Sequence, residues 1–346
     1  MKHTHKVMFA WWETWGHVMP LVSLATYLRE EGEYEFIWLW QRNSLEEEMA
    51  EVHNIQFKSI SAWKIRRYFD IRNFYEPLKN LTGIIESIIH ILRFKPDYIF
   101  SKGWFVALPV CIAGWILRKP IYIHESDSIM GSSNKLSSCF AQKIFYTFPW
   151  KYIDNIKHIH CWPIMHPEMI DHVTSMEMEE NDRLKILVIA GIQWSTKIFQ
   201  ALLDILKDCK DVDFHIILWN KNLHFRQKFL PFPNVELYDF LKPAKLWNLM
   251  QTCDIAITRG SSTLWELMYF GIHCIVIPFK ATWWDHQSSN AQYFHTKYGF
   301  DVLDEEKELS LKIFRKIQKY KDTRKSNLNL EGFFDGLHAI EKELKQ

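Results

Sequence analysis

The stretch 258–292 constrains the fold of this chain more than any other, because it alternates apolar strands with helical segments and polar turns. The apolar run 254–259 is typical of a buried strand, and the small residues 260–263 after it predict a turn. Apolar residues then recur at helical spacing until Gly271, a glycine typical of a helix C-terminus, and the run 274–279 indicates a second strand. Strand–helix–strand units of this kind predict an α/β domain with a parallel sheet.

Polar side chains follow both predicted strands of this stretch. Glu266 lies in the first turns of the predicted helix, and Gln287 and Asn290 follow the second strand. Ligands of open α/β sheets bind beyond the carboxyl ends of the strands, and a helix N-terminus there favours phosphate. A carboxylate at the same edge can accept hydrogen bonds from the paired hydroxyls of a sugar. The combination indicates a nucleotide-sugar, although an ordinary strand–helix–strand unit with a polar loop explains the same residues.

The stretch resembles the donor-site signature of the GT-B glycosyltransferases, and within them the MurG family, in Glu266 and in the segment DHQSSNA at 285–291. The similarity extends from about Met8 to about Gly299. It implies the α/β GT-B fold, in which two Rossmann-like domains with parallel sheets face a central cleft. The domain 1–162 would face the acceptor and the membrane. The domain 163–346 would bind the UDP-sugar and end in a helix that packs back.

Members of the MurG family transfer N-acetylglucosamine from UDP-GlcNAc to lipid I, the undecaprenyl-diphospho-muramoyl-pentapeptide, and so form lipid II of peptidoglycan. The resemblance therefore implies an inverting hexosyltransferase with UDP-GlcNAc as donor, a lipid-linked diphosphate as acceptor, and no metal or other cofactor. Another UDP-sugar transferase and a UDP-GlcNAc 2-epimerase are alternatives within the same fold. A non-catalytic sugar-nucleotide-binding protein is the alternative from a different class.

The resemblance also assigns site residues. His17, which follows the predicted strand 6–10, matches the histidine proposed as the family's general base. A histidine can take a proton from a sugar hydroxyl near neutral pH, whereas a lone histidine after a strand is more often structural. The glutamate matching Glu266 holds the donor ribose in that family. The residues implied to bind UDP-GlcNAc are Thr14, Trp15, Gly16, Asp127, Met165, Ile192, Gln193, Leu241, Gly260, Ser261, Ser262, Thr263, Leu264, Trp265, Glu266, Gln287 and Asn290.

A basic and aromatic stretch, 61–69, precedes an apolar helical segment. We expect Lys64, Arg66 and Arg67 in this stretch to contact the acceptor's diphosphate or an anionic membrane surface. Asn134, which the resemblance retains, is expected to join them. A solvated loop with snorkelling side chains is the alternative for the basic stretch.

Three donor positions depart from the family pattern. Asp127 stands where the family has an asparagine, Met165 where it has an arginine that meets the donor phosphates, and Ile192 where it has a serine. An aspartate can accept a hydrogen bond but cannot donate one as an amide does, and a thioether cannot pair with a phosphate. One phosphate contact of the family is therefore missing.

Glycine is scarce in this chain and tryptophan abundant, at 12 and 16 of 346 residues. Eight tryptophans stand where the family carries glycine, and glycine there permits positive φ and close approach of the backbone to phosphate. Either the chain is a remodelled, inactive relative, or UGA codons for glycine have been read as tryptophan. The intact mass of the native protein separates the two. The eight are Trp11, Trp12, Trp15, Trp40, Trp63, Trp104, Trp194 and Trp219.

Composition narrows the class of partner and the compartment. A net charge of +1 gives no reason to expect bulk nucleic-acid binding. The six cysteines contain no CxxC pair and indicate buried thiols in a reducing compartment, without a disulfide framework or zinc site. The longest apolar run, 105–117, is shorter than the ~20 residues that span a bilayer. We therefore expect a cytoplasmic protein, peripheral on the inner face of the cell membrane.

Overall fold

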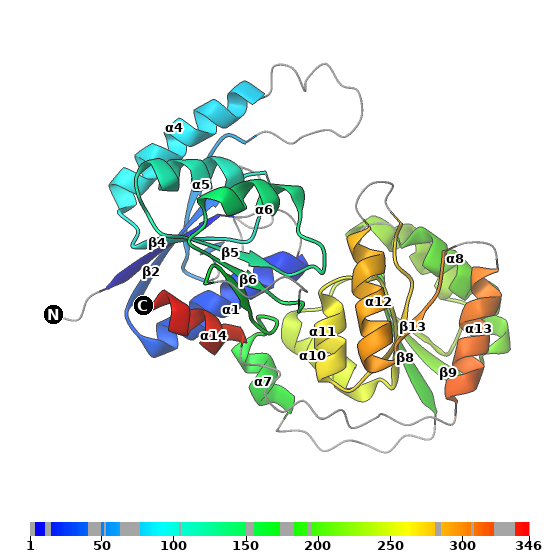
Figure 1. The fold of residues 1–346 in the computed structure, drawn as a ribbon. Coiled ribbons are helices and arrows are strands. Elements are labelled where there is room, and N and C mark those ends of the chain that lie inside the picture. The colour runs from blue at the N-terminus through cyan, green and yellow to red at the C-terminus, as the bar shows by residue number, and fades with distance from the viewer. Residues whose placement is uncertain are drawn as a thin grey trace. The chain divides into compact units, whose positions relative to one another are not determined.

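The computed structural model describes residues 4–10, 15–40, 50–51, 53–62, 77–103, 105–149, 156–173, 183–191, 195–280, 285–305, 308–321 and 336–345, without the side chains of 15–18, 77–78 and 171–173. The chain forms two compact units (Figure 1). Unit 1 comprises Met1–Pro167 and Gly332–Gln346, and unit 2 comprises Glu168–Glu331. The division falls five residues after the expected boundary at 162, and the last helix belongs to unit 1.

Unit 1 contains a seven-stranded sheet in which every described pairing is parallel, with strand order β3-β2-β1-β4-β5-β6-β7. Its strands are β1 (His5–Ala10), β2 (Tyr34–Trp40), β3 (Gln56–Ser59), β4 (Tyr98–Ser101), β5 (Ile121–Glu125), β6 (Lys143–Tyr146) and β7 (His158–His160). Its helices are α1 (Trp15–Glu31), α4 (Pro77–Phe94), α5 (Ala107–Ile116), α6 (Ser132–Ser137), the short 3-10 helix η1 (Ser138–Phe140) and α14 (Gly336–Leu344). The strand order reverses between β1 and β4, which is where doubly wound sheets bind ligands.

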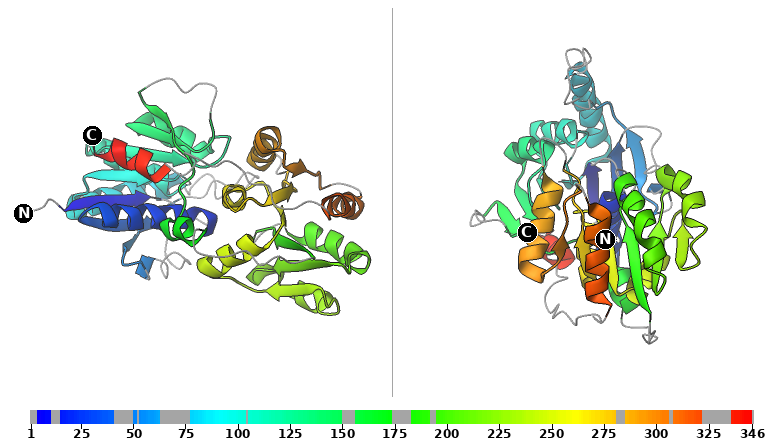
Figure 2. Two further views of the ribbon diagram at one scale, coloured as in Figure 1. Left: turned by 90° about the horizontal axis from the view of Figure 1, so that it is seen from below. Right: turned by 90° about the vertical axis from the view of Figure 1, so that its right-hand side faces the viewer.

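Alternate residues of the unit 1 strands enter two separate cores. Val7 and Phe9 of β1 face one core, and Met8 and Ala10 face the other. Helices α1 and α14 cover the first face and lie side by side, blue and red in Figures 1 and 2. Helices α4 and α5 cover the second face. Because both faces are covered, the strands are continuous apolar runs, as expected of a buried parallel sheet.

The last helix is attached to unit 1 by polar contacts as well as by its apolar face. The Tyr27 hydroxyl donates to a Glu341 carboxylate oxygen at 3.1 Å, and Lys143 forms an ion pair with Glu343. The C-terminal helix thus lies within unit 1. Helix α1 begins at Trp15, and Pro20 lies inside it. A proline lacks the N–H that would bond four residues back, so α1 is without that one hydrogen bond.

Unit 2 contains a six-stranded sheet, also parallel in its described pairings, with order β10-β9-β8-β11-β12-β13. Its strands are β8 (Leu184–Ile189), β9 (Val212–Ile217), β10 (Val235–Tyr238), β11 (Ile255–Thr258), β12 (His273–Val276) and β13 (Asp301–Val302). Its helices are α8 (Thr196–Ile205), η2 (Leu206–Asp208), η3 (Asn220–Phe225), α9 (Arg226–Phe229), α10 (Pro243–Thr252), α11 (Thr263–Tyr269), α12 (His286–Tyr298) and α13 (Leu309–Tyr320). Helix α7 (Pro167–Val173) begins at the boundary with unit 1.

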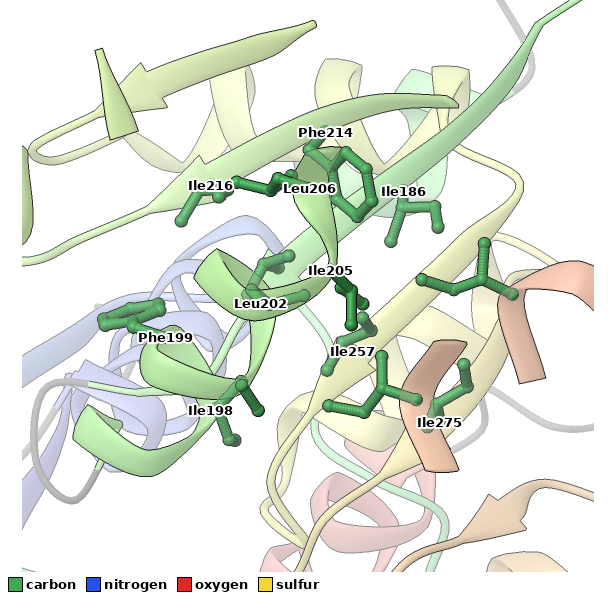
Figure 3. Packing of buried hydrophobic residues seen from close by; sticks show 14 of the residues in the cluster. Ile186, Ile198, Phe199, Leu202, Ile205, Leu206, Phe214, Ile216, Ile257 and Ile275 are labelled. Carbon is green, nitrogen blue, oxygen red and sulfur yellow. The ribbon is translucent and has the colours of Figure 1, made fainter. Parts of the chain in front are cut away.

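One core of unit 2 lies between its sheet and helices α8 and α13 (Figure 3). Ile198, Phe199 and Leu202 of α8 pack against strand residues such as Ile186 and Ile257, and all five are buried. Two Rossmann-like units with parallel sheets confirm the predicted fold class. Of the six cysteines, five are buried and Cys139 is exposed, so the expectation of buried thiols holds for five. None of the helices in the described part of the chain is long and apolar enough to cross a membrane.

Candidate functional site

The turn after β11 lies at the point where the strand order of unit 2 reverses, between β8 and β11. We call residues 260–263 the β11 turn. A Cβ on Gly260 would lie 2.1 Å from the backbone oxygen of Gln287, so a side chain at this position has no room. The Asn290 side-chain amide donates to the Gly260 carbonyl oxygen at 3.1 Å. The β11 turn therefore packs directly against the first turns of α12.

The start of α12 is fixed by polar side chains. The Asp285 carboxylate accepts a hydrogen bond from the Ser288 backbone N–H at 3.1 Å and caps the helix. The Gln287 side-chain oxygen accepts from the Phe279 backbone N–H at 2.8 Å, which ties the helix to the segment that leaves β12. These contacts bring the two sequence segments predicted to form the donor site, after β11 and after β12, to one edge of the sheet.

Glu266 occupies the first turn of α11, as the sequence predicted. Its side chain is partly exposed. Burial raises the pKa of Glu266 to about 7, because the surrounding protein desolvates the charged form. A carboxyl group that changes charge near neutral pH thus lies beside the β11 turn.

Three of the expected donor contacts are buried apolar side chains. Leu264 and Trp265 are 0% and 1% exposed, and Leu241 is 9% exposed. The backbone N–H groups of Leu264 and Trp265 donate to Ser261 and Ser262 carbonyl oxygens at 3.1 and 3.0 Å. Helical spacing directs the Leu264 and Trp265 side chains into the core, where Trp265 packs on the Phe294 ring at 4.7 Å. Contact of these three residues with the donor stays a prediction.

Asn290 is likewise fully buried, at 0% exposed. Its side-chain amide donates to the Gly260 carbonyl oxygen, so Asn290 supports the β11 turn. A direct contact between Asn290 and the sugar stays a prediction. Ser261, Ser262, Thr263 and Gln287 are all partly exposed and remain donor-site candidates.

A second polar cluster lies in unit 1, where its strand order reverses between β1 and β4. Lys102 follows β4, and its backbone N–H donates to the Ala10 carbonyl oxygen at 3.2 Å. Gly103 has a φ of +97°, and a Cβ there would lie 2.5 Å from the Asn134 side-chain oxygen. Glycine is thus required by both conformation and space. We call Lys102, Glu125 and Asn134 the unit 1 polar cluster.

Glu125 is buried and accepts three hydrogen bonds. Its oxygens accept from the backbone N–H groups of Asp127 and Gly131, both at 3.0 Å, and from the Asn134 amide at 2.9 Å. Burial and the neighbouring Asp127 raise the pKa of Glu125 to about 7, against the three donors that lower it. The carboxylate therefore holds the loop that carries Asp127.

Lys102 is 5% exposed, and its ammonium nitrogen has no hydrogen-bond partner among the described residues. Burial lowers the pKa of Lys102 to about 8, although Glu125 and Asp127 partly restore it. A buried ammonium without a partner is costly, so such a group is typical of a position that receives an anion. Sequence reasoning missed Lys102, although its position between a strand and a glycine was a usable signal.

Two other predicted unit 1 residues are buried, and their roles at the acceptor and the donor stay predictions. Asn134 is 4% exposed. It bonds to Glu125 and has its oxygen against Gly103. Met165 is 4% exposed. Asp127 is partly exposed on the loop after β5 and remains a donor-site candidate.

Several predicted residues lie outside the described part of the chain. For Trp15, Gly16 and His17 the backbone is placed in the first turn of α1, but their side chains are not described. The predicted site residues for which neither backbone nor side chain is described are Thr14, Lys64, Arg66, Arg67, Ile192 and Gln193. Within the described residues, no three His, Cys, Asp or Glu side chains gather into a group that could hold a metal.

Two of the eight unexpected tryptophans have described side chains. Trp40 is 1% exposed at the end of β2 and belongs to an aromatic core. Trp219 has φ 57° and ψ 159°, a backbone conformation that is almost restricted to glycine. The structure thus separates a tryptophan that packs well from one whose backbone favours glycine.

Comparisons with known proteins match both units. Residues 8–146 match the glycosyltransferase family 28 N-terminal domain, and residues 185–331 match the family 28 C-terminal domain. A relative from Clostridium botulinum is 30% identical over 98% of this chain and 96% of its own length, and one from Clostridium novyi is 33% identical over 91% and 92%. Both are named UDP-N-acetylglucosamine–N-acetylmuramyl-(pentapeptide) pyrophosphoryl-undecaprenol N-acetylglucosamine transferase.

Solved structures share the fold. Acinetobacter baumannii MurG superposes with a TM-score of 0.75 at 18% identity, covering 99% of this chain and 100% of its own. A UDP-GlcNAc 2-epimerase from Neisseria meningitidis bound to UDP-GlcNAc has a TM-score of 0.67 at 14% identity, with 99% and 100% covered. The resemblance read from the sequence is confirmed: this chain belongs to glycosyltransferase family 28.

Proposed function

We propose that this chain transfers N-acetylglucosamine from UDP-GlcNAc to lipid I and so forms lipid II. The observation that carries the proposal is the position of Glu266, a carboxyl with a near-neutral pKa beside the β11 turn. The names of full-length relatives at 30% and 33% identity support the choice of donor and acceptor. The likeness to a UDP-GlcNAc 2-epimerase rests on 14% identity and supports the fold alone.

On this proposal the donor binds at the carboxyl edge of the unit 2 sheet. Glu266 accepts hydrogen bonds from the ribose hydroxyls, and the partly exposed residues of the β11 turn face the diphosphate. The Gln287 side-chain oxygen is bonded to the Phe279 backbone N–H, so Gln287 donates to the sugar through its amide nitrogen.

The acceptor binds at the carboxyl edge of the unit 1 sheet. There the unpartnered Lys102 ammonium would receive one phosphate of the lipid diphosphate. His17, at the start of α1, takes the proton from the acceptor hydroxyl. The hydroxyl oxygen then attacks the anomeric carbon as the bond to UDP breaks, and UDP leaves with the bonding electron pair. The configuration at that carbon is inverted.

Helix α4 supports a peripheral position on the inner face of the membrane. Leu81, Ile85, Ile89 and Leu92 form a stripe along it that is 41–59% exposed, which we call the α4 stripe. Trp115 and Ile116 at the end of the adjacent α5 are 59% and 50% exposed. The exposed basic residues Lys79, Arg93, Lys95 and Arg118 lie on the same two helices or directly after them. An apolar face with basic residues around it is typical of binding to an anionic bilayer surface.

The activity is tested with UDP-GlcNAc and lipid I. UDP release that requires lipid I, together with lipid II formation, supports the transferase. Conversion of UDP-GlcNAc without an acceptor would indicate the epimerase instead. His17→Ala should abolish transfer and leave UDP-GlcNAc binding intact, whereas Glu266→Ala should weaken donor binding. Binding without turnover in the unaltered protein would favour the non-catalytic alternative.

The membrane contact is tested by sedimentation with vesicles that contain about one-third anionic lipid. Ile85→Glu places a charge in the α4 stripe and should release the protein from the vesicles. Leu311→Glu is the control, since Leu311 is 40% exposed on α13 of unit 2. Equal binding by both variants would remove the α4 stripe from the membrane contact.

A further inference from the structure

The residue directly before the β11 turn is a buried arginine. Arg259 is 3% exposed, and one terminal guanidinium nitrogen donates to the Ile277 carbonyl oxygen at 2.8 Å. The other terminal nitrogen pairs with a Glu305 carboxylate oxygen at 2.5 Å. Arg259 directly follows β11, Ile277 follows β12 and Glu305 follows β13. One side chain therefore joins the ends of three neighbouring strands at the edge where the donor is proposed to bind.

Glu305 also extends the network toward α8. Its second carboxylate oxygen lies 3.6 Å from the ammonium nitrogen of Lys197, in the first turn of that helix. The Glu305 side chain is 11% exposed and that of Arg259 is 4% exposed, whereas Lys197 is 62% exposed. The buried Arg259–Glu305 contact is therefore the one that water screens least.

The charge of Arg259 is buried too deeply to stand alone. A guanidinium does not lose its proton at neutral pH, so it needs an anionic partner or water. Removing the carboxylate would take a buried anionic partner away from the guanidinium, which is strongly destabilising. The turn is held on its other side by Asn290, which bonds to the Gly260 carbonyl at 3.1 Å.

We propose that Glu305 is a positioning residue for the nucleotide-sugar: by neutralising Arg259 it fixes the β11 turn and the start of α11, where Glu266 lies. The inference rests on the proposed donor site and deepens it. Glu305 itself touches no substrate on this proposal. A displacement of about 1 Å in such a site can cost about 100-fold in rate or affinity.

The test compares Glu305→Gln with Asp304→Asn. Asp304 precedes Glu305 and pairs with Lys280 at 2.8 Å, but both side chains are about half exposed, at 49% and 53%. Both changes remove one carboxylate from the same loop. Glu305→Gln should raise the KM for UDP-GlcNAc by about 10- to 100-fold with a smaller change in kcat and in the KM for lipid I. Asp304→Asn should leave kcat and both KM values near those of the unaltered enzyme.

The double variant Arg259→Gln/Glu305→Gln gives the decisive comparison, because it removes both charges and keeps polar groups of similar size. It should bring the donor KM back to within a few-fold of the unaltered enzyme. If Arg259 instead bound the donor phosphate itself, the double variant would be as poor as Arg259→Gln alone, and the proposal would be overturned. If Glu305→Gln does not fold, the proposal is tested by comparing the donor KM of the double variant with that of Arg259→Gln alone.

Hydrogen exchange without ligand separates this inference from the proposed function. The backbone amides of 260–266 should exchange faster in Glu305→Gln than in Asp304→Asn, whatever the donor is. Unchanged exchange would overturn the positioning role even in an active enzyme. Faster exchange in a protein that does not bind UDP-GlcNAc would instead leave the positioning role intact and remove the proposed donor.

Discussion

The Asn290 side-chain amide donates to the Gly260 carbonyl oxygen at 3.1 Å, so α12 holds the turn that precedes Glu266. The two residues are far apart in sequence but meet because β11 and β12 are adjacent parallel strands. The same approach leaves no space for a side chain on Gly260, whose Cβ would lie 2.1 Å from the Gln287 backbone oxygen. The two halves of the proposed donor site therefore form one packed structure.

Asn290→Ala should destabilise the protein and weaken donor binding together. The change leaves the buried Gly260 carbonyl without its partner, a loss worth about 1–3 kcal/mol in the free energy of unfolding. Urea unfolding measures that loss, and the KM for UDP-GlcNAc reports the effect on the site. Gln292→Ala on the same helix is the control, because Gln292 is exposed and its side chain bonds to Thr296, which is also exposed. Equal stability of the two variants would contradict the role assigned to Asn290.

Donor affinity should rise with pH through neutrality. Burial raises the pKa of Glu266 to about 7, and the ionised carboxylate is the better acceptor for two ribose hydroxyls. If only the ionised form binds, affinity for UDP-GlcNAc increases roughly tenfold from pH 6 to pH 8, following the ionised fraction. The diphosphate of UDP-GlcNAc is a diester and carries no proton that titrates in this range.

Glu266→Gln is the control for this pH dependence, and calorimetry measures both proteins. The variant should bind UDP-GlcNAc with an affinity that is flat between pH 6 and 8. The free energy of unfolding should show the opposite trend, because folding raises the pKa of Glu266. The stabilisation from Glu266 is fully present below its pKa in the unfolded chain, near 4.5, and is lost as pH rises through 7. A pH dependence shared by Glu266→Gln would assign the titration to other groups, such as Glu125 or Lys102.

The sequence predicted the strands and turns around Glu266 because their apolar periodicity and glycines are local signals. It did not reveal that the Leu264 and Trp265 side chains are buried, because proximity to a motif does not say which way a helical residue points. It missed Arg259–Glu305 because that contact joins strand ends whose adjacency follows from the topology. Long-range pairs of this kind require the sheet order, which a single sequence does not contain.

Lys102→Met should make the protein more stable and less active. The change removes a buried ammonium that has no partner among the described residues, and replacing buried charges by apolar groups of similar size is often stabilising by about 1–4 kcal/mol. Burial lowers the pKa of Lys102 to about 8, so the buried charge destabilises the folded protein fully below that pH. This destabilisation vanishes above the pKa of lysine in the unfolded chain, near 10.4. The stability difference between the two proteins should therefore shrink from pH 7 to pH 10.

The acceptor kinetics of Lys102→Met distinguish a functional lysine from a merely tolerated one. The KM for lipid I should rise while the KM for UDP-GlcNAc stays constant, since the unit 1 polar cluster is proposed to receive the acceptor's diphosphate. Lys58→Met, at an exposed position on β3, is the matched control and should change neither KM. A stabilised Lys102→Met with unaltered acceptor kinetics would remove Lys102 from the acceptor site.

Trp219→Gly should stabilise the protein even though it deletes a large side chain. At φ 57° and ψ 159° a non-glycine residue carries backbone strain of about 1–3 kcal/mol, which glycine relieves. The indole lost by the change is partly exposed and meets Phe240 edge-on at 5.8 Å, so little buried contact is removed. Trp40→Gly is the comparison: Trp40 is 1% exposed in a strand, and its loss should cost about 3–5 kcal/mol. Thermal unfolding of both variants measures the two effects, and a destabilised Trp219→Gly would show that the indole contact outweighs the strain.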